Sequence, residues 1–223
     1  MKRNLREYFS IAGMFCVVSL LACGRPPQTA EESGGRTGVE AYLFDAELRR
    51  SGKPTSFRLE VFDADSVIAL SGRGYLGKGA LRGRLTPDSL ICYFPSSNEY
   101  VREPILSLLR SGECQFAPIG INLLNLFDQL PDSASLDSTI DIVPNYQDSR
   151  RPTFIIYIEN CPWQMELTYR TRDRLGWRLD EFVFFDGKDT RLKATCREFK
   201  SAATVKPDRF NVRIPDDAFR IIP

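Results

Sequence analysis

Apolar and polar residues alternate strictly along several stretches of this chain, and that alternation limits the fold more than any other feature. In the clearest stretch every second residue is apolar, at Trp163, Met165, Leu167 and Tyr169. The pattern returns in the first half of the sequence, at 42–49, 57–61 and 81–85. Because successive side chains of a strand point to opposite faces, each stretch predicts a strand with one buried and one solvated face. Such strands are typical of antiparallel sheets.

Further strands are predicted at 67–71, 90–94, 153–158, 177–185, 191–199 and 210–214. Within 177–185 the apolar positions switch from odd to even numbers, which predicts a β-bulge near Asp180 and Glu181. Asp186-Gly187 then predicts a hairpin into the next strand. No helix of crossover length separates most of these strands, so a parallel β-α-β arrangement is not expected.

Two short helices are predicted between the two sets of strands. The first covers 104–112, where Pro104 suits the first turn of a helix and Leu108 follows at helical spacing. The second covers 121–131 and is apolar on nearly all sides. A helix of that composition is buried or covers an apolar surface, so it either fills the core of the sheet or acts as a lid over a hydrophobic cavity.

These elements together predict a mainly β fold of the α+β class. We expect a strongly curved antiparallel sheet, or unclosed half β-barrel, of eight to eleven strands, with the two short helices covering or filling its concave face. Hydrophobic residues make up 43% of the chain, which is enough for a substantial core. One domain, from 39 to 223, is the expected size for such a sheet.

The N-terminal segment carries the pattern of a bacterial lipoprotein signal peptide. Leu20-Leu21-Ala22-Cys23 fits the lipobox and follows a basic start and an apolar run of about 14 residues, which is short for a bilayer span. We therefore predict cleavage between Ala22 and Cys23, removal of 1–22 and acylation of Cys23. The alternatives are an uncleaved anchor or an ordinary secretory signal cut elsewhere. The polar segment 23–38 is expected to be a flexible tether.

Composition excludes several classes of function. The chain contains no histidine, which removes the commonest general base and the commonest transition-metal ligand. It also has no G-x-S-x-G motif. From these two absences together we expect neither catalysis nor a metal or other cofactor. The formal net charge of +1 gives no electrostatic basis for binding nucleic acid.

Four cysteines remain unmodified after the predicted removal of 1–22 and acylation of Cys23. An even number in an exported domain suggests disulfides, with three connectivities available. Cys114 and Cys161 lie in or beside predicted loops and form the preferred pair, whereas Cys92 and Cys196 lie in predicted strands. Buried free thiols are the alternative.

Two further patterns have ordinary structural interpretations. The run from Gly72 to Gly77 matches G-x-G-x-x-G, but a strand rather than a helix is predicted after it, so a nucleotide site is not expected. The neighbouring acids Asp180 and Glu181 are expected to be surface charges. Arg170 could belong to a basic strip along its strand, although a solvated face is the simpler interpretation.

The order of the segments resembles the LolA/LolB-like superfamily of bacterial lipoprotein carriers and receptors. The resemblance spans roughly 39–215 and is carried by 57–61, 65–70, 81–90, 98–100 and 209–215, the last resembling a closing strand. It implies an unclosed barrel around an apolar cavity, helices as a lid, and non-covalent binding of acyl chains or lipoproteins. The soluble carriers of that superfamily lack a lipid anchor, so this chain is closer to the anchored receptors.

Two functions follow as hypotheses. The first is a lipoprotein anchored through Cys23, facing the periplasm from the outer membrane, that binds a lipid, acyl chain or lipoprotein, with transport to the outer membrane as its role. The residues expected to line its cavity are Leu108, Leu123, Leu126, Phe127, Met165, Leu167, Phe182 and Phe184. The second is a structural or assembly lipoprotein with a filled core that acts through contacts with other proteins, which the sequence does not identify.

Overall fold

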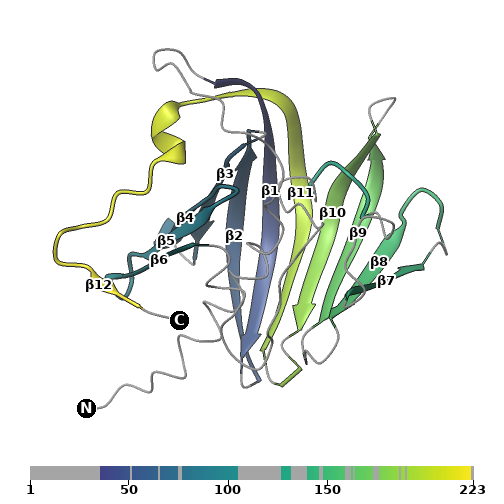
Figure 1. Ribbon diagram of the computed structural model, residues 1–223, viewed down its shortest axis with the longest axis horizontal. Helices are drawn as coiled ribbons and strands as arrows, with labels where there is room; N and C mark the ends of the chain where they lie inside the picture. The colour runs from purple at the N-terminus through teal and green to yellow at the C-terminus, as the bar shows by residue number, and fades with distance from the viewer. Residues whose placement is uncertain are drawn as a thin grey trace.

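A single twelve-stranded sheet contains nearly all the regular structure of the computed structural model (Figure 1). The structure describes residues 36–50, 52–64, 66–74, 77–104, 127–131, 140–145, 148–158, 162, 164–172, 176–185, 187–188 and 190–221. The first six strands are β1 (Arg36–Arg50), β2 (Lys53–Asp63), β3 (Ile68–Arg73), β4 (Gly79–Leu85), β5 (Ser89–Phe94) and β6 (Glu99–Pro104). The second six are β7 (Ile140–Asn145), β8 (Thr153–Ile158), β9 (Gln164–Arg172), β10 (Gly176–Phe185), β11 (Thr190–Val205) and β12 (Phe219–Arg220).

The sheet consists of two meanders joined at β1 and β11. Its strand order is β12-β6-β5-β4-β3-β2-β1-β11-β10-β9-β8-β7, so β12 and β7 are the two edges and the sheet is not closed. All pairs are antiparallel except β12 with β6, which is parallel. We call β2–β6 the first wing and β7–β10 the second wing. The predicted curved, unclosed and mostly antiparallel sheet is thus confirmed (Figure 1).

The two predicted helices fall mostly outside the described residues, which omit 105–126. Where their ends are described, they are not helical. Pro104 is the last residue of β6 rather than the first turn of a helix, and Phe127 begins a turn. A described helical element is the 3₁₀ turn η4 (Pro207–Phe210).

The predicted strand at 210–214 is wrong. Pro207 begins η4, and residues 211–215 have no regular structure before β12 pairs beside β6. Phe210 is 5% exposed and packs with Val39, Val67, Ala69 and Val205 in a small apolar cluster of its own. The apolar and polar residues at 210–214 therefore alternate although this segment pairs with no strand.

The predicted β-bulge in β10 is confirmed. The pairing of β10 with β9 shifts register between Leu179 and Glu181. On its other side, β10 pairs with β11 only from Glu181 onward, opposite Thr195. The first half of β10 therefore lies outside the β11 ladder, and its backbone N–H groups are available to another segment. The hairpin predicted at Asp186-Gly187 is also observed, since β10 and β11 are consecutive and antiparallel.

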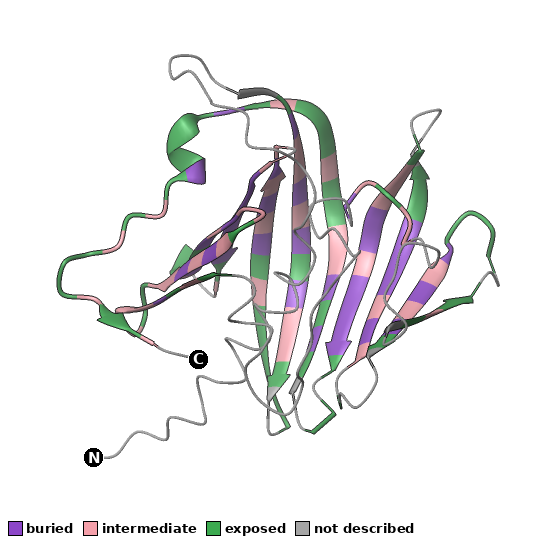
Figure 2. Cartoon of the chain, viewed as in Figure 1, coloured by how far each residue is buried: buried purple, intermediate pink, exposed green. Residues whose placement is uncertain are grey.

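The two faces of the sheet differ sharply in composition. Every strand from β1 to β6 and from β8 to β11 contributes buried apolar side chains to one continuous cluster, and we call the side that carries it the apolar face. The opposite side, the polar face, carries most of the charged residues of the strands. Figure 2 shows the result as buried bands that alternate with exposed or half-buried bands along the strands.

β1 begins at Arg36, three residues before the predicted start of the domain.

Candidate functional site

Four of the predicted cavity residues lie side by side on the apolar face. Phe182 of β10 is opposite Leu167 of β9, and Phe184 is opposite Met165. All four side chains are buried, with exposures of 7% or less. The alternation in β9 and the switched parity in β10 therefore place these residues together, and their role as a cavity lining stays a prediction.

Phe127 joins this group from outside the sheet. Its ring lies 5.3 Å from the ring of Tyr42 and 6.5 Å from that of Phe44, between ring centroids, and Phe44 lies 6.0 Å from Phe182. Its carbonyl oxygen accepts hydrogen bonds from the Tyr42 hydroxyl (3.0 Å) and from the backbone N–H of Leu179 (2.8 Å). Leu179 is free to donate because the bulge separates this part of β10 from β11. The other predicted cavity residues, Leu108, Leu123 and Leu126, lie outside the described residues.

A pair of alanines marks the lowest point of the strands' own side chains on the apolar face, and we call this covered point the depression. One row of cross-strand neighbours runs from Phe57 through Ala46 and Ala194 to Phe182. Ala46 is 4% exposed and Ala194 0%. Because a methyl group is the shortest apolar side chain, the face is lowest between the two phenylalanines, directly over the joint of the two wings. Sequence reasoning missed Ala194, since only the register between β1 and β11 shows that it lies beside Ala46.

Tyr169 carries a buried polar atom on the apolar face that lacks a partner in the part of the chain that the structure describes. The hydroxyl of Tyr169, a residue that is 0% exposed, makes no hydrogen bond there. Burial raises the pKa of Tyr169 well above its ordinary value, and the nearby Asp128 carboxylate adds to the shift. The hydroxyl is therefore a neutral donor at physiological pH, and leaving it unsatisfied costs about 1–3 kcal/mol.

Asp180 is a buried carboxylate rather than the predicted surface charge. It is 3% exposed and pairs with Arg151 (2.8 Å) and Arg170 (3.2 Å). The bulge turns it away from the position that simple alternation would give, and Arg151 comes from the connection between β7 and β8. Glu181 is half-buried and pairs with Lys193 at 3.0 Å. Arg170 is therefore part of an ion pair at the end of the second wing.

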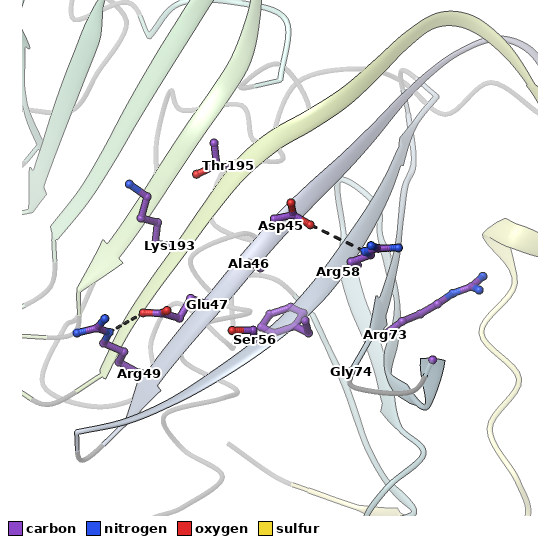
Figure 3. A pocket seen from close by; sticks show the side chains of 12 residues that line it. Asp45, Ala46, Glu47, Arg49, Ser56, Arg58, Arg73, Gly74, Lys193 and Thr195 are labelled. Atoms are coloured by element: carbon purple, nitrogen blue, oxygen red, sulfur yellow. Dashed lines mark hydrogen bonds and ion pairs between the residues drawn. The ribbon is translucent and has the colours of Figure 1, made fainter.

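A pocket of about 910 Å³ lies on the polar face over β1, β2, β3 and β11 (Figure 3). Its charged lining residues are Arg49, Arg58, Arg73, Lys193, Asp45 and Glu47. Gly74 and Gly77, from the G-x-G-x-x-G run, form part of its wall. Gly77 has a positive φ of 73°, and β4 begins two residues later. The run is thus a hairpin loop between strands, which is what the sequence predicted in place of a nucleotide site.

The remaining predictions concern sulfur, metals and the membrane segment. Cys92 and Cys196 are free thiols, whereas the predicted pair Cys114–Cys161 and the predicted lipidation site Cys23 lie outside the described residues. Among the described residues, no cluster of carboxylates and cysteines could hold a metal ion. None of the helices described is long and apolar enough to cross a membrane.

No protein-family model matches the chain, and no relative is found among curated proteins. Among solved structures, it is similar to a putative outer membrane lipoprotein-sorting protein domain from Vibrio parahaemolyticus, with 9% identity, a TM-score of 0.43, and coverage of 93% of this chain and 97% of that one. An uncharacterized conserved protein from Thermus thermophilus has 13% identity and a TM-score of 0.41, over 81% and 90% of the two chains. A DUF1329 family protein from Desulfovibrio piger has 11% identity and a TM-score of 0.33, over 94% and 98%. These likenesses are distant, and membership of the LolA/LolB-like superfamily stays a prediction.

Proposed function

We propose that this protein is a cell-envelope lipoprotein that binds an acyl chain of a lipid or lipoprotein on the apolar face of its sheet. The observation that carries the proposal is the continuous apolar face of an unclosed sheet, with the depression at Ala46 and Ala194 in its middle. In a closed barrel or a sandwich, the apolar face is filled by the protein's own side chains, so a low point there would serve no purpose. Here the lowest point lies where both wings can contact one elongated ligand.

The energetics suit an acyl chain. Each buried methylene contributes about 0.8 kcal/mol. Ten methylenes over the alanine pair would therefore contribute about 8 kcal/mol, which corresponds to a micromolar dissociation constant before entropic costs. Since Ala194 is 0% exposed, binding requires the residues that cover the depression to move aside. Phe127 packs on the neighbouring Tyr42 and Phe44, and we propose that it moves with the covering residues, at the cost of the two hydrogen bonds to its carbonyl.

The Tyr169 hydroxyl gives the apolar face one polar contact. It is a buried donor with no partner among the described residues. An ester or carboxyl oxygen at the end of an acyl chain would accept its hydrogen bond and remove the cost of leaving it unsatisfied. We therefore place the polar end of the ligand near Tyr169 and the chain along the row toward Ala194.

The location rests on the signal segment. The lipobox supports cleavage after Ala22 and anchoring of the chain through acylated Cys23. Two or more acyl chains anchor a protein stably where one does not. Gly24 after the cysteine, where an aspartate would resemble the enterobacterial inner-membrane retention signal, favours the outer membrane, with the domain facing the periplasm. No catalytic step is part of the proposal.

The test is to fill the depression. Ala194→Leu adds three carbons where we place the ligand, and Ala69→Leu makes the same change in the small cluster on the other face. The full chain and both variants are purified, and their bound lipids are extracted and identified by mass spectrometry. We expect lipid with the unaltered protein and with Ala69→Leu, and little or none with Ala194→Leu.

Stability measurements separate this proposal from a filled core. In a filled core Ala194→Leu would cost about 1–3 kcal/mol of unfolding free energy through overpacking, as we expect for Ala69→Leu. In a ligand site the lipid-free Ala194→Leu variant keeps its stability. Unaltered protein without extractable lipid, together with a destabilised Ala194→Leu, would contradict the proposal.

A second candidate, contact with another protein, is favoured by an exposed apolar patch. On the polar face of the second wing, Tyr157 and Phe185 flank Gln164, and each is 39% exposed. Val143 of β7 is 48% exposed. A photo-crosslinking residue at position 157 would form a covalent adduct in cells if this patch binds a protein, whereas the same residue at position 82 in the first wing would not.

A further inference from the structure

We propose that the pocket on the polar face binds a phosphate group through Arg58 and Arg73. This site lies on the opposite side of the sheet from the proposed acyl-chain site. Ala46 and Phe57 of the alanine row also line the pocket, but the phosphate proposal rests on Arg58 and Arg73 and the acyl-chain proposal does not. Either proposal can therefore fail without the other.

The first argument is that the two arginines face each other. Arg58 and Arg73 are direct partners in the register of β2 and β3, and both line the pocket. Like charges directly opposite each other on one face of a sheet are destabilising. The facing arginines therefore lower the stability of the sheet. A ligand that binds both charges would explain why they are present.

The second argument is a local excess of positive charge. Asp45 is shared between Arg58 (4.0 Å) and Arg197 (3.8 Å). Glu60 is shared between Arg73 (3.6 Å) and Arg209 (3.4 Å). Four guanidinium groups therefore surround two carboxylates, at distances too long for strong hydrogen bonds. The surplus is two positive charges, and most of the N–H donors remain available.

The third argument is access. The side chains of Arg58 and Arg73 are 62% and 47% exposed, and Figure 3 shows them beside each other at the pocket. Gly74 and Gly77 present no side chain to the pocket. A Cβ atom at Gly77 would meet nothing within 4 Å, so the wall beside Arg73 is open. A group of several atoms fits a volume of about 910 Å³.

The chemistry favours phosphate. A guanidinium presents a planar fork of donors that matches phosphate oxygens in a bidentate manner. A phosphate monoester carries a charge of about −1.5 to −2 at neutral pH, which balances the surplus of two, whereas a carboxylate carries only one charge. The phosphate could belong to a soluble phosphate ester or to a lipid headgroup, and the experiment distinguishes these sources.

The experiment uses the full chain in a non-ionic detergent and two named probes. The soluble probe is sn-glycerol 3-phosphate, titrated calorimetrically. The membrane probe is vesicles of phosphatidylcholine containing phosphatidic acid, tested by flotation of protein freed of detergent. Arg58→Gln with Arg73→Gln is the test variant. Arg102→Gln, an exposed arginine of β6 in the same wing but outside the pocket, is the matched control.

We expect the double variant to bind at least about tenfold more weakly, a loss of about 1.4 kcal/mol, and Arg102→Gln to bind as the unaltered protein does. Binding of glycerol phosphate alone identifies a soluble ester as the source. Because acylated Cys23 would hold the protein on any vesicle, a headgroup is identified by retention that is stronger with phosphatidic acid than with phosphatidylcholine alone and that the double variant loses. Equal weakening by Arg102→Gln would show general surface charge and overturn the proposal. Absence of binding to both probes would overturn it as well. Because all three arginines are exposed, thermal unfolding of each variant checks that the fold is kept.

Discussion

The two wings of the sheet share one core but have opposite outer surfaces. On the polar face, the first wing carries five arginines, Arg58, Arg73, Arg82, Arg84 and Arg102. The corresponding face of the second wing carries apolar side chains, Val143, Ile155, Tyr157, Val183 and Phe185. Both wings nevertheless contribute buried residues to the same cluster on the apolar face.

This difference shows which face of the sheet folding constrains and which face it does not. Antiparallel strands need apolar residues on one face only, so the fold constrains the apolar face of both wings alike. The polar face is free to vary, and its two halves have diverged in charge and in polarity. We therefore propose anion binding through the arginines of the first wing, any protein contact on the second, and an acyl chain over the joint between them.

The largest expected effect tests the shared core. Leu85→Ala in the first wing and Leu167→Ala in the second each remove a side chain that is at most 1% exposed. Each should lower the free energy of unfolding by about 2–5 kcal/mol. Urea unfolding followed by circular dichroism and by tryptophan fluorescence should give coincident transitions for both variants. Two separate transitions would show that the wings fold independently and that the comparison of two faces on one core is wrong.

Alkaline pH should weaken both wings together. Burial raises the pKa of the Cys92 thiol in the first wing above its ordinary 9.0, and that of Tyr169 in the second above 10.0. The folded protein keeps these protons while the unfolded chain releases them, so stability is full below pH 9 and falls as pH rises above it. Each group contributes a loss of about 1.4 kcal/mol per pH unit above its ordinary pKa. Urea midpoints from pH 8 to 11 should show this fall. Tyr169→Phe should make it less steep above pH 10 but not abolish it, because Cys92 and Tyr42, whose pKa values burial also raises, still contribute.

The ion pairs at the end of the second wing should matter more than those over the joint. Asp180→Ala leaves Arg151 and Arg170 without their buried carboxylate and should cost about 2 kcal/mol. Asp45→Ala removes a 57% exposed carboxylate with longer contacts and should cost less than about 0.5 kcal/mol. Equal losses in thermal or urea unfolding would mean that burial of Asp180 adds nothing.

The contact that ties Phe127 to both sides of the joint can be weakened without altering the core. Tyr42→Phe removes a hydroxyl whose single proton is shared between the Glu40 carboxylate (2.7 Å) and the Phe127 carbonyl (3.0 Å). We expect a loss of about 1 kcal/mol in stability and faster uptake of a fluorescent fatty acid. Slower uptake would contradict the placement of Phe127 over the ligand site.

The smallest expected effect concerns the facing arginines of the first wing. Arg58→Gln removes a like-charge pair across β2 and β3 and one long ion pair to Asp45. The unfolding free energy should change by less than about 0.5 kcal/mol, and in the stabilising direction at low salt. A clear destabilisation that persists at low salt would show that the arginine pair serves the fold rather than a ligand.

The sequence predicted the features that depend on neighbouring residues. Alternation located most strands, and the change of parity in β10 located the bulge beside Asp180. Two predictions were wrong because proline occurs in more than one kind of structure. Pro104 lies at the end of β6, beyond the two residues that β12 pairs, so its missing N–H leaves no ladder bond unmade. Pro207 begins η4 where the alternation alone suggested a strand soon after.

The remaining features depend on which distant segments meet. Arg151 and Asp180 are 29 residues apart, and their ion pair exists only because the bulge redirects Asp180. Ala46 and Ala194 become neighbours through the register of β1 with β11. The charge surplus at Asp45 and Glu60 likewise needs several distant segments of the chain in place. No local pattern encodes such coincidences, which is why the polar-face pocket could not be predicted.

The pairing of β1 with β11 also sets the order in which this protein can be completed. β1 is made first, yet the strand that covers its open edge begins at Thr190. Until that strand arrives, β1 presents fifteen residues of unpaired backbone beside an apolar face. Contacts so distant in sequence form slowly, because a long loop must close before they form. A growing or newly exported chain therefore remains open to pairing with another molecule until nearly its last segment is in place, and a truncation before β11 should aggregate rather than fold.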